Sequence, residues 1–497
     1  MSALLARIED HARQQPDAVA LADGQATLSY RELAEEIRRL AGLLAGRRVG
    51  LLLDNGMPWA CLDLALRRAG AVCVPMPGFF SPGQQAHLIH DAGLALIATD
   101  APERAAELLG DWTASRIEAA GRPVWLFRPA MSSAGKHRAL PPGTAKVTYT
   151  SGTTGSPKGV CLSGEAIEAV AASLAEAVAA SPDDRALSLL PLSTLLENIG
   201  GLYAPLWAGG RAQLPALAEC GLAGSSGLEP LRLFGALLRF APTTAILVPQ
   251  LLKALVEVAT AGQAVPSSLR FAAVGGAPVA TGLLARARGL GIPAYQGYGL
   301  SEAASVVCLN LPGAEREGSV GRPLPGLQVS VTDAGEVMVG GRLFLGYLGD
   351  AASGTGAWAT GDLGYLDADG FLHLTGRKKT AYATAFGRNV APEWVESELA
   401  GQAGIAQAAV FGDGRPFNVA VLVPRSAPEA LAAAVAAVNQ RLPDYARIGR
   451  WLVADAPFTA GNGLLNGAGA LVRHAVAAQY RQRIDQLFEK EEMHDAV

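Results

Sequence analysis

Short apolar runs bounded by turn residues recur through the first three quarters of the chain, and segments with a helical period lie between them. The runs are RRVGLLLDNG at 47–56, AGAVCVPMPG at 69–78, LALIATD at 94–100, TTAILVPQ at 243–250, LRFAAVGGAP at 269–278 and IPAYQGYG at 292–299. Apolar positions three and four apart predict helices at Tyr30–Leu44, Trp59–Ala69 and Gly164–Ala180. Because strands that alternate with helices usually pair in parallel, this part predicts an α/β fold around a largely parallel sheet.

Two local patterns add detail at the N-terminal end. MSALLARIEDHARQQPD, residues 1–17, carries acidic and basic residues among its apolar positions, so it predicts an amphipathic helix and not a secretory signal. Ser29 precedes the next helical run and Glu32 follows three residues later, which is the pattern of a capping box.

The pattern changes from about Leu311 to short strands and turns. The segments GLQVSVTDAGEVMVGG and GYLDADGFLHLTGR read as hairpins, which predicts a β-rich subdomain over 311–377. The last 120 residues have their own pattern, with helices expected at Pro392–Ala400, Pro428–Leu442 and Leu471–Phe488 and strands at AAVFGD and NVAVLVP. We therefore expect a large domain over 1–377 and a small α+β domain over 378–497.

Composition excludes several classes of protein. The formal net charge of -4 gives no basic footprint for nucleic acid. The five cysteines are far apart and lack CxxC spacing, which argues against a disulfide framework and a structural zinc site. Alanine-rich runs are too short and too interrupted to span a bilayer. A soluble protein of the reducing cytoplasm, without an integral membrane segment, is expected.

The segment YTSGTTGSPKGV, 149–160, follows a short β-like run. Glycine permits close backbone approach, and Ser and Thr hydroxyls with successive N–H groups can surround phosphate oxygens, while Lys158 adds positive charge. These features indicate a phosphate clamp. A flexible linker of the same composition is the alternative, and the usual P-loop spacing is absent because Gly159 follows the lysine.

At this loop the chain resembles the adenylate-forming (ANL) superfamily of acyl-CoA synthetases, peptide-synthetase adenylation domains and luciferases, because four further segments match in order and spacing. They are VGGAP at 274–278, YQGYGLSE at 295–302, ATGDLGYLDADG at 359–370 and TGRKK at 375–379. The resemblance implies αβαβα layers with a distorted β-barrel subdomain, followed by a small mobile C-terminal domain. Local sequences such as GRNVAPEWVE are most similar to those of long-chain acyl-CoA synthetases.

The resemblance also implies roles for individual residues. Tyr298 would stack on adenine, Ser301, where relatives usually have Thr, would touch the α-phosphate, and Asp362 and Arg377 would contact the ribose. The alternative interpretation of Asp362 and Arg377 is that they are ordinary charged residues in surface turns. The full set of implied nucleotide contacts is Ser151, Gly152, Thr153, Thr154, Gly155, Gly276, Ala277, Gly297, Tyr298, Gly299, Ser301, Asp362 and Arg377.

Further implied roles concern catalysis, substrate and motion. Lys158, Glu302 and Thr150 are the implied catalytic residues, and Thr150 and Glu302 would organise Mg²⁺. Lys379 would be the hinge of the small domain, and Gly387 would let a pantetheine pass. The implied acyl-pocket residues are Thr194, Asn198 and Gly275, although apolar neighbours there are at least as typical of ordinary core.

One position departs from the family pattern. The family carries T-x-x-G-K-x-x-R near the C-terminus, whereas this chain has NGAGALVR, with Ala470 in the place of the lysine. Losing a cation at a developing phosphoryl charge predicts adenylation slower by on the order of a hundredfold. An inactivated form, a variant that uses another cation (Lys158, Lys378 or Lys379) and a chain that has lost adenylation all remain open.

The resemblance implies a two-step reaction with ATP, Mg²⁺ and a thiol. A hydrophobic carboxylic acid, fatty or aryl, would form an acyl-adenylate with release of pyrophosphate, and the acyl group would then pass to coenzyme A. One alternative is a ligase that loads an acyl carrier protein, through its phosphopantetheine, or an amine. Another is a nucleotide- or acyl-binding protein without turnover, which Ala470 favours.

Overall fold

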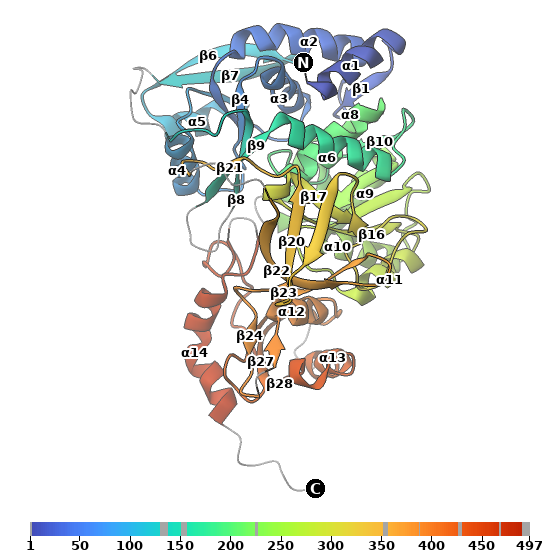
Figure 1. The fold of residues 1–497 in the computed structure, drawn as a ribbon, viewed down its shortest axis with the longest axis vertical. Helices are drawn as coiled ribbons and strands as arrows, with labels where there is room; N and C mark the ends of the chain where they lie inside the picture. Colours follow the sequence, from blue (N-terminus) through green and yellow to red (C-terminus); the bar gives the residue numbers. More distant parts are fainter. Residues whose placement is uncertain are drawn as a thin grey trace.

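The computed structural model describes residues 2–129, 138–150, 157–223, 227–350, 356–386, 388–425, 430–466 and 469–489. Figure 1 shows a large domain that contains the N-terminus and, at its lower end, a smaller domain that carries the last strands and helices. In the described part of the chain, no helix combines the length and apolarity needed to cross a membrane.

The first large sheet is parallel at its centre and antiparallel at both edges. Parallel pairing joins β15 to β14 and β16, and β16 turns back on β17 as an antiparallel hairpin. In spatial order the strands are β18 (Arg322–Pro323), β17 (Ser305–Leu309), β16 (Ala294–Leu300), β15 (Phe271–Val274), β14 (Thr244–Leu247), β10 (Arg185–Leu187), β11 (Arg211–Gln213), β1 (Val19–Ala22) and β2 (Thr27–Ser29).

The second large sheet has the same plan. Its central strands β8, β4, β3 and β5 are parallel, and antiparallel strands flank them. In spatial order they are β21 (Gly346–Tyr347), β9 (Lys158–Ser163), β8 (Thr144–Thr150), β4 (Val72–Pro75), β3 (Arg48–Leu52), β5 (Leu96–Thr99), β7 (Arg122–Pro129) and β6 (Trp112–Ala119). The expected parallel pairing is therefore confirmed, but the strands divide between two sheets, which period alone does not specify.

Helices lie between and outside these sheets. One apolar core joins side chains of α3 and α6 to both sheets, for example Leu64, Ala171, Val160 and Phe271, so these two helices form the middle layer. The helices of the large domain are α1 (Ala3–Gln14), α2 (Tyr30–Leu44), α3 (Met57–Arg68), α4 (Pro82–Ala92), α5 (Pro102–Leu109), α6 (Gly164–Ala177), α7 (Leu195–Glu197), α8 (Ala204–Ala208), α9 (Pro230–Phe240), α10 (Pro249–Thr260) and α11 (Thr281–Gly289). A π-helix, η1 (Asn198–Tyr203), joins α7 to α8.

The capping box that the sequence predicts is present at α2. The Ser29 hydroxyl accepts from the Glu32 N–H, and the Glu32 carboxylate accepts from the Ser29 N–H. The amphipathic N-terminal helix is also present as α1, although α6 ends at Ala177, three residues earlier than expected.

The β-rich segment forms an antiparallel sheet, as the hairpin pattern predicts. Its strands are β19 (Leu327–Val331), β20 (Glu336–Gly341), β22 (Trp358–Leu366) and β23 (Leu372–Arg377). All five cysteines of the chain lie in described segments of the large domain, and each is buried and unpaired.

The small domain packs a short sheet between helices and has apolar clusters of its own. Its elements are β24 (Tyr382–Ala383), β25 (Asn389–Val390), α12 (Pro392–Ala400), β26 (Ile405–Phe411), β27 (Asn418–Pro424), α13 (Ala430–Asn439), β28 (Ile448–Val453) and α14 (Arg473–Glu489). The bounds of α12 agree with the prediction, and α13 and α14 lie within two to three residues of theirs where the chain is described.

Candidate functional site

The β8–β9 hairpin positions the two ends of the loop that the sequence predicts to bind phosphate. Thr150 on β8 is the register partner of Lys158 on β9, so the loop between them is closed by a strand pair. The predicted loop contacts Ser151, Gly152, Thr153, Thr154 and Gly155 lie outside the described residues. Lys158 Nζ lies 5.5 Å from the centre of the Tyr347 ring, within reach of a cation–π contact.

Glu302 is held beside this hairpin. It lies in the short 3₁₀ turn Ser301–Ala303, directly after β16, and its backbone carbonyl accepts from the Phe344 N–H at 2.7 Å. The Tyr347 hydroxyl donates to Glu302 Oε1, also at 2.7 Å. Burial and this carboxylate raise the pKa of Tyr347, which keeps its hydroxyl a donor. Lys158 and Glu302 therefore converge on one aromatic ring.

Tyr347 was not predicted as a site residue. No local motif marks it, because its place depends on β21 pairing with β9, where Tyr347 faces Val160 across the ladder. A polar aromatic residue in a two-residue strand, some 190 positions from its partner, has no signature in the sequence.

The predicted ribose contacts are assembled by one hairpin. Asp362 on β22 and Arg377 on β23 are register partners, and Arg377 Nε donates to Asp362 Oδ1 at 2.6 Å. The Tyr298 hydroxyl donates to Asp362 Oδ2 at the same distance. Asp362 is 5 % exposed, and burial together with this carboxylate raises the pKa of Tyr298. The three residues thus form one fixed, charge-assisted group, which isolated surface turn charges would not form.

Glycines in the two neighbouring motifs allow close approach of backbones. Gly276 has φ +82°, which disfavours other residues, whereas a Cβ at Gly275 would make an ordinary contact of 3.5 Å with the carbonyl oxygen of Gly297. A Cβ at Gly299 would lie 1.8 Å from the Ser305 carbonyl oxygen, because the β16–β17 hairpin is irregular there. The adenine-side loop, with Gly276 and Ala277 exposed at its tip, therefore lies against β16.

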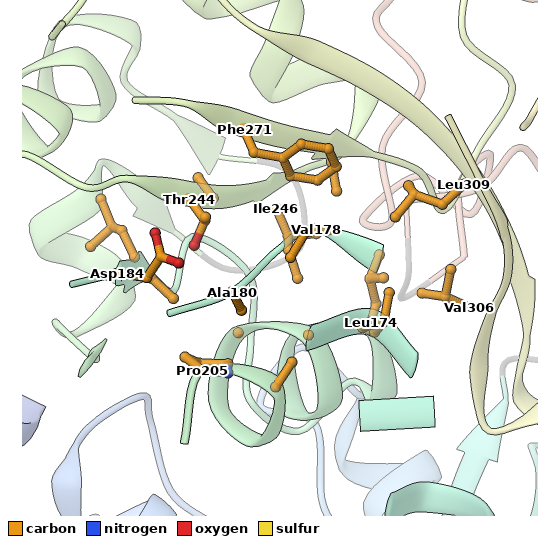
Figure 2. Close-up of a pocket in the computed structure, with 18 residues that line it drawn as sticks. Leu174, Val178, Ala180, Asp184, Pro205, Thr244, Ile246, Phe271, Val306 and Leu309 are labelled. Atoms are coloured by element: carbon orange, nitrogen blue, oxygen red, sulfur yellow. The ribbon is translucent and has the colours of Figure 1, made fainter. Parts of the chain in front are cut away.

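An apolar cavity of about 70 Å³ lies between strands β14, β15 and β17 on one side and α6, η1 and α8 on the other. Figure 2 shows Ile246 and Phe271 from the sheet opposite Leu174 and Pro205 from the helices, with Val306 at one end. The side chains that complete the wall are almost all apolar; they include Leu187, Leu196, Ala204, Ala245, Ala273 and Leu309. Leu309 is also the register partner of Gly297, so the cavity and the nucleotide motif share a strand pair.

The π-helix η1 forms the floor of this cavity with Gly200 and Gly201. A Cβ at Gly200 would lie 2.6 Å from Ile246 Cδ1, and one at Gly201 would lie 1.9 Å from the Glu197 carboxylate. Any side chain at either position would therefore enter space that the sheet or the helix now occupies. Neither glycine is among the three acyl-pocket residues, Thr194, Asn198 and Gly275, that the resemblance implies.

The three predicted acyl-pocket residues lie elsewhere in the described structure. The Thr194 hydroxyl donates to the Pro191 carbonyl at 2.8 Å, and Gly275 is backbone beside Gly297. Asn198 is buried away from the cavity wall, where it accepts from Lys146 and donates to Asp63. Its contacts give it a structural role, and the assignment of these three residues to substrate stays a prediction.

Asn198 belongs to a buried polar cluster under η1. Lys146 Nζ lies 2.8 Å from Asp63 Oδ1, and the Tyr203 hydroxyl donates to Asp63 Oδ2 at 2.6 Å. Despite its burial, the pKa of Asp63 is lowered, because Lys146 and these donors stabilise the carboxylate. The cluster joins β8 and α3 to both ends of η1.

Glu197 occupies a different environment at the start of η1. It is 0 % exposed, and burial raises its pKa to about 8, while the Leu190 N–H donates to Oε2 at 3.1 Å. This carboxyl group is therefore protonated at neutral pH. A neutral acid beneath an apolar cavity avoids the desolvation of a charge.

The small domain carries the remaining predicted positions. Lys379 is exposed directly after β23, and Gly387 lies outside the described residues. Ala470 is exposed in a tight turn, where it exchanges bonds of 2.8 and 2.9 Å with Asn466. Arg473, the last residue of NGAGALVR, pairs with Glu396 of α12 at 2.6 Å and anchors the start of α14.

The described residues offer two donors for magnesium, the Glu302 carboxylate and the Thr150 hydroxyl. Among the described residues, no group of three or more His, Cys, Asp or Glu side chains is placed to hold a metal. Mg²⁺ usually keeps several waters and binds through one or two carboxylates and substrate phosphates. Glu302, whose Oε2 is not used by Tyr347, and the Thr150 hydroxyl are compatible with such a site.

Comparison with known proteins agrees with this arrangement. The family model described as AMP-binding enzyme matches residues 8–348, and that of the AMP-binding enzyme C-terminal domain matches residues 382–492. A long-chain-fatty-acid–CoA ligase, FadD15 of Mycobacterium bovis, is 30 % identical over 84 % of this chain and 81 % of that protein. A fatty acid–[acyl-carrier-protein] ligase, ScoC of Streptomyces coeruleorubidus, is 28 % identical over 81 % and 82 %.

Solved structures show the same fold. The o-succinylbenzoate CoA synthetase of Bacillus subtilis, in complex with its acyl-adenylate intermediate, superposes with a TM-score of 0.75 at 24 % identity, covering 95 % of this chain and 97 % of that one. The amide bond synthetase McbA of Marinactinospora thermotolerans gives a TM-score of 0.74 at 27 % identity, covering 96 % and 99 %. With both of its domains matched, the chain belongs to the AMP-binding enzyme family.

Proposed function

We propose that this protein activates an apolar carboxylic acid with ATP and transfers the acyl group to the thiol of coenzyme A. The observation that carries the proposal is the shared strand pair: Gly297 of the nucleotide motif faces Leu309 of the apolar cavity across the β16–β17 ladder. An acid bound with its tail in the cavity would present its carboxylate next to the nucleotide. The FadD15 relative, named for long-chain fatty acids, supports this class of substrate.

The first half-reaction joins the acid to AMP. A carboxylate oxygen attacks the α-phosphorus of ATP, and the bond from that phosphorus to the bridging oxygen of pyrophosphate breaks. In this proposal Asp362 and Arg377, which are paired across one hairpin, would hold the ribose, and Lys158 would attract phosphate oxygens. Because both reactants are anions, most of the protein's contribution is positioning and charge stabilisation. Magnesium, when bound near Glu302, would supply further positive charge to the phosphates.

The second half-reaction needs no protein nucleophile. The thiol sulfur attacks the acyl carbon, the thioester bond forms and AMP leaves with the electron pair. The buried positions of all five cysteines, each of which has a raised pKa from burial, agree with a reaction that uses none of them. Alternation of the small domain about Lys379 would exclude water from the mixed anhydride between the two steps.

Adenylation is proposed to be slow in this chain. Ala470 stands where the family pattern has a lysine, and a cation that contacts a developing phosphoryl charge commonly contributes a few kcal/mol. The Ala470 side chain is exposed and its turn is closed by Asn466, so a lysine fits there without repacking. Thiol transfer, which does not use that lysine, would be less affected.

Acid-dependent ATP–pyrophosphate exchange tests the proposal, with fatty acids of increasing length and aryl acids as substrates. The expected result is exchange that rises with the apolar surface of the acid, together with loss of free thiol when coenzyme A is added. Exchange restricted to small polar acids would contradict the assignment of the cavity.

A second acceptor is favoured by one comparison. ScoC, a relative over most of its length, is named for transfer to an acyl carrier protein. The same assay with phosphopantetheinylated carrier protein in place of coenzyme A distinguishes the two acceptors. Faster thioester formation on the carrier protein would replace coenzyme A in the proposal and leave the acid class unchanged.

A further inference from the structure

Lys253 lies on α10 of the large domain, but its ammonium group is held by the small domain. Nζ donates to the main-chain carbonyl oxygens of Ala400, of Gln402 at 3.4 Å and of Ile405 at 3.1 Å. Ala400 is the last residue of α12, so the cation meets the negative end of that helix dipole and carbonyls that lack partners within the helix.

The environment of Lys253 is dry for a lysine. Its side chain is 8 % exposed, and burial, followed by Arg425, lowers its pKa to about 8, against a smaller opposing effect of Glu257. Arg286 of α11 lowers the pKa slightly further. A buried ammonium group is tolerated when its donors are used, and here three carbonyl oxygens from one short stretch of the small domain supply the acceptors.

Two neighbouring contacts extend the same interface. Glu257, one turn further along α10, pairs with Arg425 of the small domain at 2.7 Å. Ala280, just before α11, faces Gly401, where an added Cβ would lie 2.8 Å from the Ala280 Cβ. The Glu257–Arg425 pair is half-exposed and contributes little alone. Of these two charged contacts, the one made by Lys253 therefore loses more stabilisation when the two domains separate.

We infer that Lys253 is a positioning residue that holds the small domain in the arrangement seen here and must be released when that domain changes pose between the half-reactions. The inference rests on the proposed two-step function. Ala400, Gln402 and Ile405 move together with the small domain, so rotation about Lys379 breaks all three bonds at once. The ammonium group is then exposed to water, and water molecules replace the three carbonyl oxygens as its hydrogen-bond acceptors.

Disulfide trapping measures this pose without activity. Ala280→Cys and Gly401→Cys place a cysteine on each side of the contact, where the two Cβ positions lie 2.8 Å apart and must separate to about 3.8 Å for a disulfide to form. The five native cysteines are buried. In the full-length chain, the rate of cross-linking by oxidised glutathione reports how often the two sides meet. Adding Lys253→Met is expected to slow cross-linking at least threefold. Arg232→Met, which removes an exposed cation on α9, serves as the control and is expected to leave the rate unchanged.

The half-reactions give the second readout. Lys253→Met is expected to change the ratio of pyrophosphate exchange to thiol transfer from preformed acyl-adenylate at least threefold, because it frees one pose and not the other. A merely stabilising role would lower both rates together. Lys253→Gln, which keeps two N–H donors, is expected to fall between wild type and Lys253→Met, and it replaces that variant if the latter does not fold.

Equal cross-linking rates in all Lys253 variants, or an unchanged ratio of half-reactions, would overturn the inference. If neither wild type nor Ala470→Lys shows exchange with any acid, the proposed function fails, while the cross-linking result still decides whether Lys253 holds the domains together.

Discussion

The proposed nucleotide side of the site and the apolar cavity share the β16–β17 hairpin but are built from different interactions. On the nucleotide side, Asp362 and Glu302 each have a fixed hydrogen-bond partner from a distant segment. On the side of the apolar cavity, the shape depends on a small residue, since a Cβ at Gly200 would lie only 2.6 Å from Ile246 and the π-helix packs directly against the sheet there. Polar groups of the first kind fix an orientation, whereas an apolar cavity selects by volume.

The largest effect is expected from Asp362→Ala. It removes the acceptor of both Arg377 and Tyr298, and hydrogen bonds to a charged group contribute about 1.5–3 kcal/mol each. Pyrophosphate exchange is therefore expected to fall by on the order of a hundredfold, mainly through a higher KM for ATP. Asp369→Ala, in the exposed turn of the same hairpin, is the control and should change little. An unchanged KM for ATP in Asp362→Ala would separate this carboxylate from the nucleotide.

Gly200→Phe tests whether the apolar cavity holds the tail of the acid. The ring would fill the cavity against Ile246, and overpacking of this kind costs about 1–3 kcal/mol. Exchange with long-chain acids is expected to fall roughly tenfold or more relative to a short acid, with the KM for ATP unchanged. Gly235→Phe, at an open position on α9, controls for the added ring. Equal loss with short and long acids would show that the cavity does not hold the tail.

Glu197 tests the apolar side through pH. Its pKa is about 8 in the folded protein and near 4.5 as a free group, so the stability it contributes is complete below pH 4.5 and is lost as pH rises through 8. We expect the free energy of unfolding to fall by on the order of a few kcal/mol across that range. In Glu197→Gln this part of the fall should disappear, which thermal denaturation at pH 5 and pH 8.5 would measure. The same pH slope in both proteins would contradict the buried, protonated state.

The smallest effect is expected from Tyr347→Phe. It removes one donor from Glu302 but keeps the ring beside Lys158, and a hydrogen bond to a charged group contributes about 1.5–3 kcal/mol, with the lower end expected at this partly exposed contact. Exchange should fall about tenfold or less, with a shifted dependence on magnesium concentration and no change in acid preference. Altered acid preference would place Tyr347 on the acyl side of the site.

The parts of the fold that depend on local sequence could be predicted. The Ser29–Glu32 capping box and the Pro392–Ala400 helix follow from short-range rules, and both are present. The division of the strands between two sheets could not be predicted, because it depends on which distant strands become neighbours.

The same distinction holds within the site. Asp362 and Arg377 stand in recognisable motifs, and the structure pairs them across one hairpin. Tyr347 and Gly200 have no motif, since the first depends on an edge strand and the second on the packing of a π-helix against the sheet. Asn198 shows the converse case: its position in a motif-like segment indicated substrate, while its contacts lie in the buried Asp63 cluster.

The most direct test of the proposed function is ATP–pyrophosphate exchange with a long-chain acid in wild type, Ala470→Lys and Ala470→Met. We expect weak exchange in wild type, an increase on the order of a hundredfold in Ala470→Lys, and no increase in Ala470→Met, which adds length without charge. Thiol transfer from preformed acyl-adenylate should be similar in all three. Absence of exchange in every form with every acid, alongside intact ATP binding, would contradict the proposal that this chain is an acyl-activating ligase.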